Sequence, residues 1–177
     1  MKSIFSTDER IRILKAIIFS NKPIGVSTIA SKLKVSKGLV SKYLDVLSKE
    51  SIARKSKGKY MIIDSVVTRG IRILINLVNI DIKIFRKFDF VEAAGLYGSC
   101  SKGENTEDSD VDIWIKTKEI SDEKAASLTA EINRKIRNVR PLFLTTKKIE
   151  KMKKEDKLFY NSLSFGSITI YGEKDAI

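Results

Sequence analysis

The chain has 177 residues, 42% of them hydrophobic, so it can form one large domain or two small ones and is not intrinsically disordered. A single cysteine and no histidine exclude an intramolecular disulfide framework, a Ser-His-Asp triad and a histidine-ligated metal, leaving only a hard ion held by carboxylates. No apolar run approaches the ~18 residues of a membrane span, and the charged N-terminus lacks a signal-like apolar segment, so we expect a cytoplasmic protein without membrane contact.

The net charge of +12 is unevenly distributed along the chain. Residues 1–63 contain 14 Lys and Arg against four Asp and Glu, whereas residues 64–177 contain 20 against 18. A basic first third joined to a nearly neutral remainder predicts two modules, of which the first faces a polyanion. We therefore expect a domain over 1–63, a linking helix over 64–86 and a second domain over 87–177.

The first module begins with three predicted helices. Apolar residues recur at helical spacing over 8–20, and further helices fit 27–33 and 37–49, with Ser36 as the cap of the third. Two apolar stretches, 52–54 and 60–63, then flank the basic, glycine-containing segment 55–59, which predicts a β-hairpin.

The segment "IASKLKVSKGLVSKYLDVLSKESIARKSKGKYMII", residues 29–63, resembles winged helix-turn-helix transcription factors. The resemblance implies that the third helix enters the major groove of duplex DNA while the wing follows the backbone. It places Lys37, Gly38, Ser41 and Lys42 of the helix, and Arg54, Lys55, Lys57 and Lys59 of the wing, at the DNA. The alternative is a module that mediates protein contacts only.

The linking helix is predicted over 66–80. One apolar line contains Val67, Ile71, Leu74 and Val78, and a second contains Val66, Ile73, Leu77 and Ile80. Such a helix can form the seam of a homodimer or pack between the two modules, and the sequence leaves both interpretations open.

In the second module, a buried strand over 93–97 runs into Gly98 and Ser99, where backbone N–H groups and a hydroxyl can approach a phosphate. Asp110 and Asp112 follow, two residues apart on a predicted strand, so both carboxylates point to one face. A cation between them would relieve their repulsion, and Mg²⁺ that also binds substrate phosphates is the obvious candidate.

The stretch "GLYGSCSKGENTEDSDVDIWI" resembles the minimal nucleotidyltransferases of the DNA polymerase β superfamily, with similarity over roughly residues 88–173. The resemblance implies an α/β (α+β) domain with a mixed sheet, a nucleoside triphosphate and Mg²⁺ or Mn²⁺ as cofactors. Gly98 and Ser99 match the phosphate-binding turn, Lys102 stands where arginine is more usual, and the motif ends with Ser109, Asp110 and Asp112. Asp110 and Asp112 would be the catalytic and metal-binding pair.

The sequence departs from this superfamily at a third acid, expected on the strand that follows the next helix. That helix is predicted over 121–137, and the strand over 139–145 contains neither Asp nor Glu. Glu92 and Glu150 are the nearby substitutes, at positions that the motif does not support. Without a general base, which contributes ~10²–10⁴-fold, we expect weak or absent transferase activity.

A last helix is predicted over 146–162, with several lysines on one side and Ile149, Met152, Leu158 and Phe159 on another. The leading function is a DNA-binding, regulatory protein whose second domain binds Mg-nucleotide. The alternatives are an active nucleotidyltransferase acting on a protein, an RNA or a small molecule, and a toxin–antitoxin component with a helical protein partner.

Overall fold

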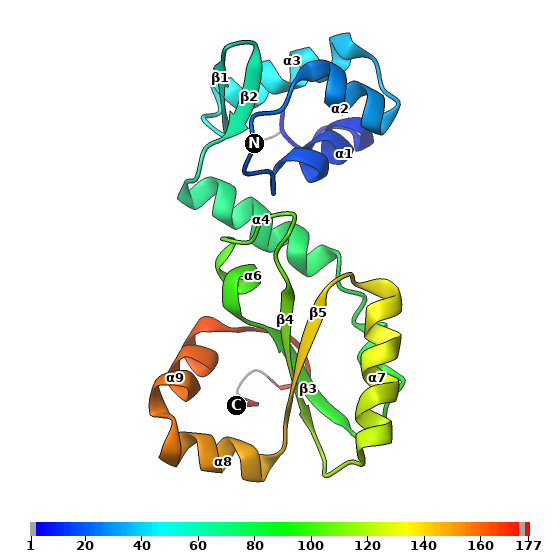
Figure 1. Cartoon of the computed structure of the whole chain (residues 1–177), viewed down its shortest axis with the longest axis vertical. Coiled ribbons are helices and arrows are strands. Elements are labelled where there is room, and N and C mark those ends of the chain that lie inside the picture. Colours follow the sequence, from blue (N-terminus) through cyan, green and yellow to red (C-terminus); the bar gives the residue numbers. More distant parts are fainter. Residues whose placement is uncertain (1–2, 174–175) are drawn as a thin grey trace. The chain divides into compact units, whose positions relative to one another are not determined.

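The computed structural model describes residues 3–173 and 176–177, and the chain divides into two units, Met1–Arg72 and Ile73–Ile177. Helix α4, Val66–Val78, contains the boundary between them (Figure 1). Helices together with a two-stranded and a four-stranded sheet confirm the predicted mixed α/β class. The boundary after Arg72 falls inside the segment 64–86 that was predicted to link the two domains.

The first unit consists of three helices followed by a β-hairpin. These elements are α1 Asp8–Ile17, α2 Val26–Leu33, α3 Lys37–Lys49, β1 Ala53–Ser56 and β2 Lys59–Ile62. The Ser36 hydroxyl accepts a hydrogen bond from the Leu39 N–H at 3.1 Å, which confirms the predicted cap of α3. The first helix ends at Ile17 rather than Ser20.

The hairpin is tighter than the sequence suggests. Ser56 pairs with Lys59, so the turn consists of Lys57 and Gly58 alone, at φ +47° and +74°. Two consecutive positive φ values are those of a type I′ turn, whose twist matches that of the strands it joins. Lys55 and Lys59, predicted in the turn, therefore lie on the strands.

Helix α4 buries a different stripe from either predicted line. Thr68, Ile71, Arg72 and Ile75 are all below 9% exposed, whereas Val67, Leu74 and Val78 are at least half exposed. The prediction counted only apolar residues, but Arg72 can be buried because its Nε donates to the Ile18 carbonyl at 2.9 Å.

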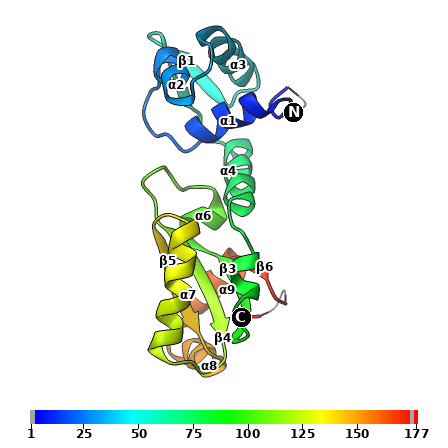
Figure 2. The ribbon, with the colours of Figure 1, turned by 90° about the vertical axis from the view of Figure 1, so that its right-hand side faces the viewer.

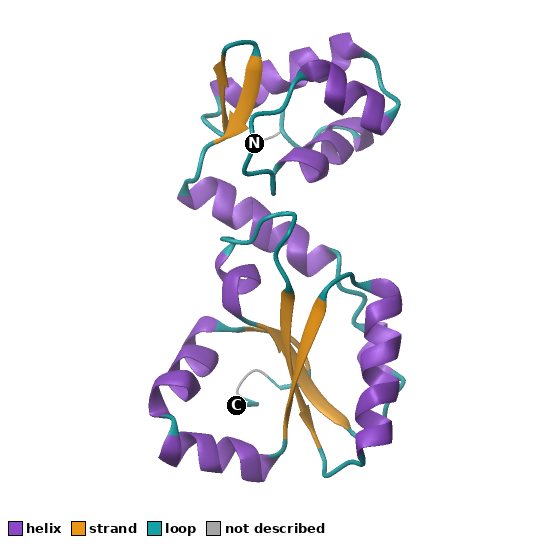
Figure 3. Ribbon diagram, in the orientation of Figure 1, coloured by secondary structure: helices purple, strands orange, loops and turns teal. Residues whose placement is uncertain are grey.

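The second unit contains a four-stranded mixed sheet in the order β5-β4-β3-β6, in which only β4 and β5 are parallel. Its strands are drawn in orange in Figure 3. Its strands are β3 Val91–Leu96, β4 Val111–Thr117, β5 Val139–Leu144 and β6 Ile168–Tyr171. Its remaining helices are α5 Lys83–Arg86, α6 Gly98–Lys102, α7 Asp122–Lys135, α8 Thr146–Glu155 and α9 Lys157–Gly166.

Alternating strand residues form two cores on opposite faces of this sheet. Ile113 and Ile115 of β4 pack with residues of α5 and α7, whereas Trp114 packs with residues of α8 and α9. The ribbon in Figures 1 and 2 shows α7 on one side of the sheet and α8 with α9 on the other. Side chains on the Trp114 face, at the starts of β4 and β5, are therefore free to form a site.

The single helix predicted over 146–162 is wrong, because two helices meet at Asp156. This residue has φ −136° and ψ 68°, outside the helical region, and its carboxylate accepts a hydrogen bond from the Phe159 N–H at 3.0 Å. The break changes the helix direction, so Leu158 and Phe159, expected on the same side as Ile149, are exposed at 87% and 39%.

Candidate functional site

The turn after β3 brings Gly98 against Asp112. The Tyr97 N–H donates to the Asp112 carbonyl at 3.1 Å, and Gly98 follows at φ +66°. A Cβ on Gly98 would lie 2.5 Å from Asp112 Oδ2, so any side chain there would displace the carboxylate. Glycine at this position thus satisfies a left-handed backbone and a close approach together.

Arg140 is the charged group on β5 that faces the aspartates. Asp112 is paired with Arg140 in the parallel register of β4 and β5, and Asp110 precedes β4 by one residue. The Arg140 guanidinium contacts Asp110 Oδ2 at 2.8 Å. Because strand residues two apart share a face, Asp112 and Arg140 lie on the Trp114 side of the sheet.

The acids considered as substitutes for a third carboxylate lie elsewhere. Glu92 is near the start of β3, at the opposite end of the strand from Gly98, and it pairs with Lys116 at 3.9 Å. Glu150 is on α8 and pairs with Lys153 at 3.0 Å. Across residues 3–173 and 176–177, no three His, Cys, Asp or Glu side chains gather as a metal site.

Burial and charge set the proton affinity of the groups in this turn. Burial raises the pKa of Asp112; the Arg140 guanidinium lowers it, and the Asp110 charge raises it again. Burial, reinforced by Asp112, raises the pKa of Cys100 to about 11. The Cys100 thiol therefore stays protonated at neutral pH and is unsuited to act as a nucleophile.

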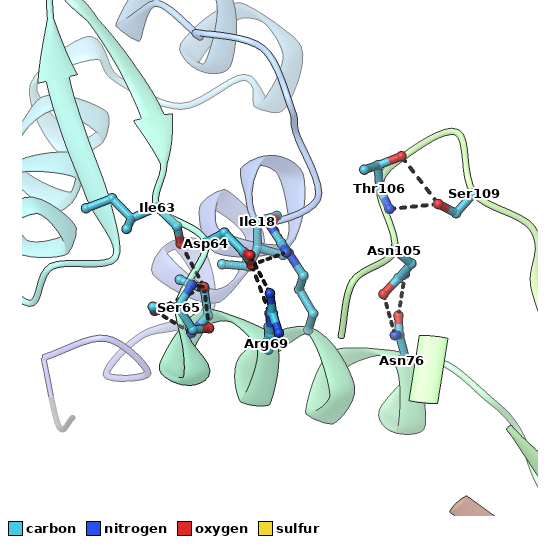
Figure 4. A network of polar contacts seen from close by, with 11 residues as sticks. Ile18, Ile63, Asp64, Ser65, Arg69, Asn76, Asn105, Thr106 and Ser109 are labelled. Atoms are coloured by element: carbon cyan, nitrogen blue, oxygen red, sulfur yellow. Dashed lines mark hydrogen bonds and ion pairs between the residues drawn. The ribbon is translucent and has the colours of Figure 1, made fainter. Parts of the chain in front are cut away.

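Polar contacts hold the turn and the following loop in place. The Ser101 hydroxyl contacts the Gly98 carbonyl at 3.0 Å and the Gly166 carbonyl at 2.7 Å, which ties α6 to the end of α9. The Asn76 amide donates to the Cys100 carbonyl at 2.9 Å. It also donates to Asn105 Oδ1 at 2.9 Å (Figure 4). The pair of buried Asn105 and half-buried Asn76 thus fastens the loop that leads to Asp110.

The remaining predicted nucleotide-binding residues lie around this turn. Ser99 is half-buried in α6, and Lys102 is exposed at its last position. The Ser109 hydroxyl accepts from the Thr106 N–H at 2.9 Å, which closes a local turn of the loop (Figure 4). Ser109 therefore has a structural partner inside the loop, whereas Gly98, Asp110 and Asp112 come together.

Sequence reasoning missed Arg140, Ser101 and Asn76 as members of the site. A charged side chain between apolar neighbours at the start of a predicted strand was the available signal for Arg140. Nothing in the spacing of Asn76 and Asn105, 29 residues apart, indicates that they meet.

Asp110 and Asp112 are the donor set for the divalent ions that the motif implies. Asp110 and Asp112 are sufficient for one hard cation that completes its shell with substrate phosphates and water. They are not sufficient for two, because Arg140 stands beside them on β5 and the described part of the chain offers no further carboxylate there. The site therefore fits one divalent cation and does not fit a two-metal centre.

The predicted DNA-contacting residues are mostly exposed on the first unit. Lys37, Gly38 and Lys42 are exposed on α3, and Ser41 is half-buried. Arg54, Lys55, Lys57 and Lys59 are exposed on the hairpin, and with Pro23 and Met61 they line a hollow of about 610 Å³. Helices long and apolar enough to cross a membrane are missing from the described residues.

Known proteins similar to this chain were found among solved structures and protein families. Curated proteins gave no match. A solved complex of tri-AMPylated Shewanella oneidensis HEPN toxin with MNT antitoxin is similar at 15% sequence identity and a TM-score of 0.39. The match covers 58% of this chain and 74% of the other. The solved structure of a proposed nucleotidyltransferase from Sulfolobus solfataricus is similar at 23% sequence identity and a TM-score of 0.35. The match covers 60% of this chain and 86% of the other.

The family comparison covers most of the second unit. Residues 80–175, more than half of the chain, match the model described as polymerase beta, nucleotidyltransferase. This range contains the Gly98 turn, both aspartates and Arg140. The chain belongs to the polymerase beta nucleotidyltransferase family.

Proposed function

We propose that the second unit binds a nucleoside triphosphate together with one divalent cation, and that nucleotidyl transfer from it is weak or absent. The observation that carries the proposal is the contact of Gly98 with Asp112, beside an Asp110 that is paired with Arg140. Gly98 lets phosphate oxygens approach the backbone, and Asp110 and Asp112 would hold Mg²⁺ or Mn²⁺. The bound cation would supply neutralisation of the phosphate charge.

The limit on transfer follows from the groups at the site. Proton removal from an attacking hydroxyl needs a base, and histidine is absent from the chain. Asp110 and Asp112 hold the one divalent cation in this proposal, Cys100 is protonated, and Glu92 and Glu150 lie elsewhere. Any remaining rate of nucleotidyl transfer would come only from positioning of the nucleotide and neutralisation of its phosphate charge.

The binding proposal is tested by calorimetry with the four common nucleoside triphosphates, with and without Mg²⁺. We expect Mg²⁺-dependent binding that disappears in the double variant Asp110→Asn with Asp112→Asn. The matched control is Asp122→Asn, an exposed carboxylate in the first turn of α7, which should bind like the unmodified chain. Equal, metal-independent binding by the double variant would overturn the proposal.

Transfer is tested with nucleotides labelled at the α-phosphate, Mg²⁺ or Mn²⁺, and protein, RNA and small-molecule acceptors. We expect little label on any acceptor. Robust labelling that Asp110→Asn abolishes would show an active nucleotidyltransferase instead. Labelling confined to a co-expressed helical protein would indicate the toxin–antitoxin alternative.

We further propose that the first unit binds duplex DNA as a winged helix-turn-helix and gives the protein a regulatory role. The N-terminal end of α3 and the hairpin carry exposed cations on a unit whose first 63 residues have a strong positive excess. Phosphate contacts by such cations release counterions, so binding should weaken steeply as salt is raised.

Gel-shift titrations at several salt concentrations test this second proposal. Lys42→Ala and Lys57→Ala should each weaken binding and lower the salt slope by about one. Lys49→Ala, an exposed lysine at the last position of α3, is the control that should change little. Absence of duplex binding at low salt would leave the protein-contact alternative.

Homodimer formation through residues 66–80 stays a prediction. It is supported by the exposure of Val67, Leu74 and Val78, which share one side of α4. Analytical ultracentrifugation should find a dimer in the unmodified chain and a monomer in Leu74→Lys. A monomer at all concentrations would contradict it.

A further inference from the structure

The ion pair at the candidate site has a geometry that bears on metal stoichiometry. Arg140 contacts Asp110 Oδ2 at 2.8 Å and is paired in register with Asp112, so one guanidinium stands beside both carboxylates. The β5 segment Val139–Leu144 has no other charged residue. The charge that β5 contributes at this place is therefore positive.

The pair does little for the stability of the fold. The Arg140 side chain is 72% exposed and that of Asp110 is 35% exposed, and ion pairs at such exposures contribute about 0–1 kcal/mol. An arginine is always protonated, so no change of pH in the physiological range removes its charge. Its main physical effect is thus to neutralise negative charge where cations would otherwise collect.

We propose that the Arg140 guanidinium is a built-in counter-ion that takes the place of a second divalent cation beside Asp110. The site then holds one divalent ion at most, and the internal cation fixes that number. This role of Arg140 rests on the proposed function for its biological meaning. The effect that can be measured is on binding of the metal ion alone.

Removal of the Arg140 charge should raise the affinity for a divalent ion, and reversal of the charge should raise it further. A unit charge a few ångströms from a divalent ion, screened as in bulk water, changes the affinity about tenfold. Arg140→Gln should therefore bind Mn²⁺ about tenfold more tightly than the unmodified chain. Arg140→Asp, which reverses the charge and adds a ligand, should gain about a hundredfold and bind two ions per chain.

The experiment is a titration of the full-length chain with Mn²⁺ alone, in which free Mn²⁺ is followed by electron paramagnetic resonance. Arg140→Lys keeps the charge and should resemble the unmodified chain in stoichiometry. The matched control is Lys153→Gln, which makes the same change of charge at an ion pair on α8, after the opposite end of β5. Its affinity should change less than twofold.

Two results would overturn the proposal: two Mn²⁺ ions bound to the unmodified chain, or affinities of Arg140→Gln and Arg140→Asp within twofold of it. Circular dichroism spectra and thermal unfolding of each variant show that the comparison is made on folded protein. Because no nucleotide is present, failure of nucleotide binding leaves this titration unaffected, and the two proposals fail separately.

Discussion

Replacement of Gly98 by alanine tests the link between the backbone of the turn and the position of Asp112. At φ +66°, any residue with a side chain costs roughly 1–2 kcal/mol of backbone strain. The new Cβ would also lie 2.5 Å from Asp112 Oδ2, and because Asp112 is only partly buried, its displacement should add about 1 kcal/mol, the low end for overpacking. We expect Gly98→Ala to destabilise the second unit by about 2–3 kcal/mol and to abolish Mg²⁺-dependent nucleotide binding.

The two costs can be separated by a double-mutant cycle. The clash involves Oδ2, whereas Asp112 Cβ would lie at 3.6 Å from the new atom, an ordinary contact. In the Asp112→Ala background, Gly98→Ala should therefore cost only the backbone term of roughly 1–2 kcal/mol.

Urea unfolding followed by fluorescence measures the cycle, since Trp114 is the single tryptophan and is buried in the sheet of the second unit. Gly58→Ala is the control for strain alone, because Gly58 has φ +74° and a Cβ added there would meet no atom within 4 Å. Gly58 belongs to the first unit, so unfolding of this variant is followed by circular dichroism. An equal cost of Gly98→Ala in the two backgrounds would refute the role assigned to the Asp112 contact.

Three further predictions concern stability. Burial raises the pKa of Asp112, so the carboxyl binds its proton more tightly in the folded state than in the unfolded state. The stability that this carboxyl contributes therefore falls as the pH rises from its ordinary pKa of 3.8 through its pKa in the folded state. Asp112→Asn should thus raise the Tm at pH 7 and lose that gain below about pH 4; an equal or lower Tm at pH 7 would contradict this. Gly95→Ala would place a Cβ 2.5 Å from the Trp114 indole and should destabilise the second unit by about 1–3 kcal/mol, and an unchanged urea midpoint would show that the core has room. The buried Tyr43 hydroxyl donates to the Ile4 carbonyl at 2.9 Å, so Tyr43→Phe should lower the unfolding free energy of the first unit by about 0.5–1.5 kcal/mol. Chemical unfolding followed by circular dichroism measures this loss, and an unchanged free energy would show that water replaces the hydrogen bond.

The local elements of this protein are determined largely by its sequence. Ser36 is predicted as a helix cap because a short hydroxyl satisfies a free backbone N–H, and it accepts such a bond in the structure. The strand that runs into Gly98 and the pair of Asp110 and Asp112 follow from a motif with fixed spacing. In these cases the partners are a few residues apart, so the pattern contains both of them.

The tertiary structure decided the features whose partners are distant in the sequence. Arg140 is 30 residues from Asp110, and only the parallel register of β4 and β5 makes them neighbours. Arg72 lies in the buried stripe of α4 because the Ile18 carbonyl, 54 residues away, receives its N–H. The Arg140 side chain is still 72% exposed, whereas Arg72 is buried, because an arginine can be buried only where the elements packed around it supply a hydrogen-bond partner.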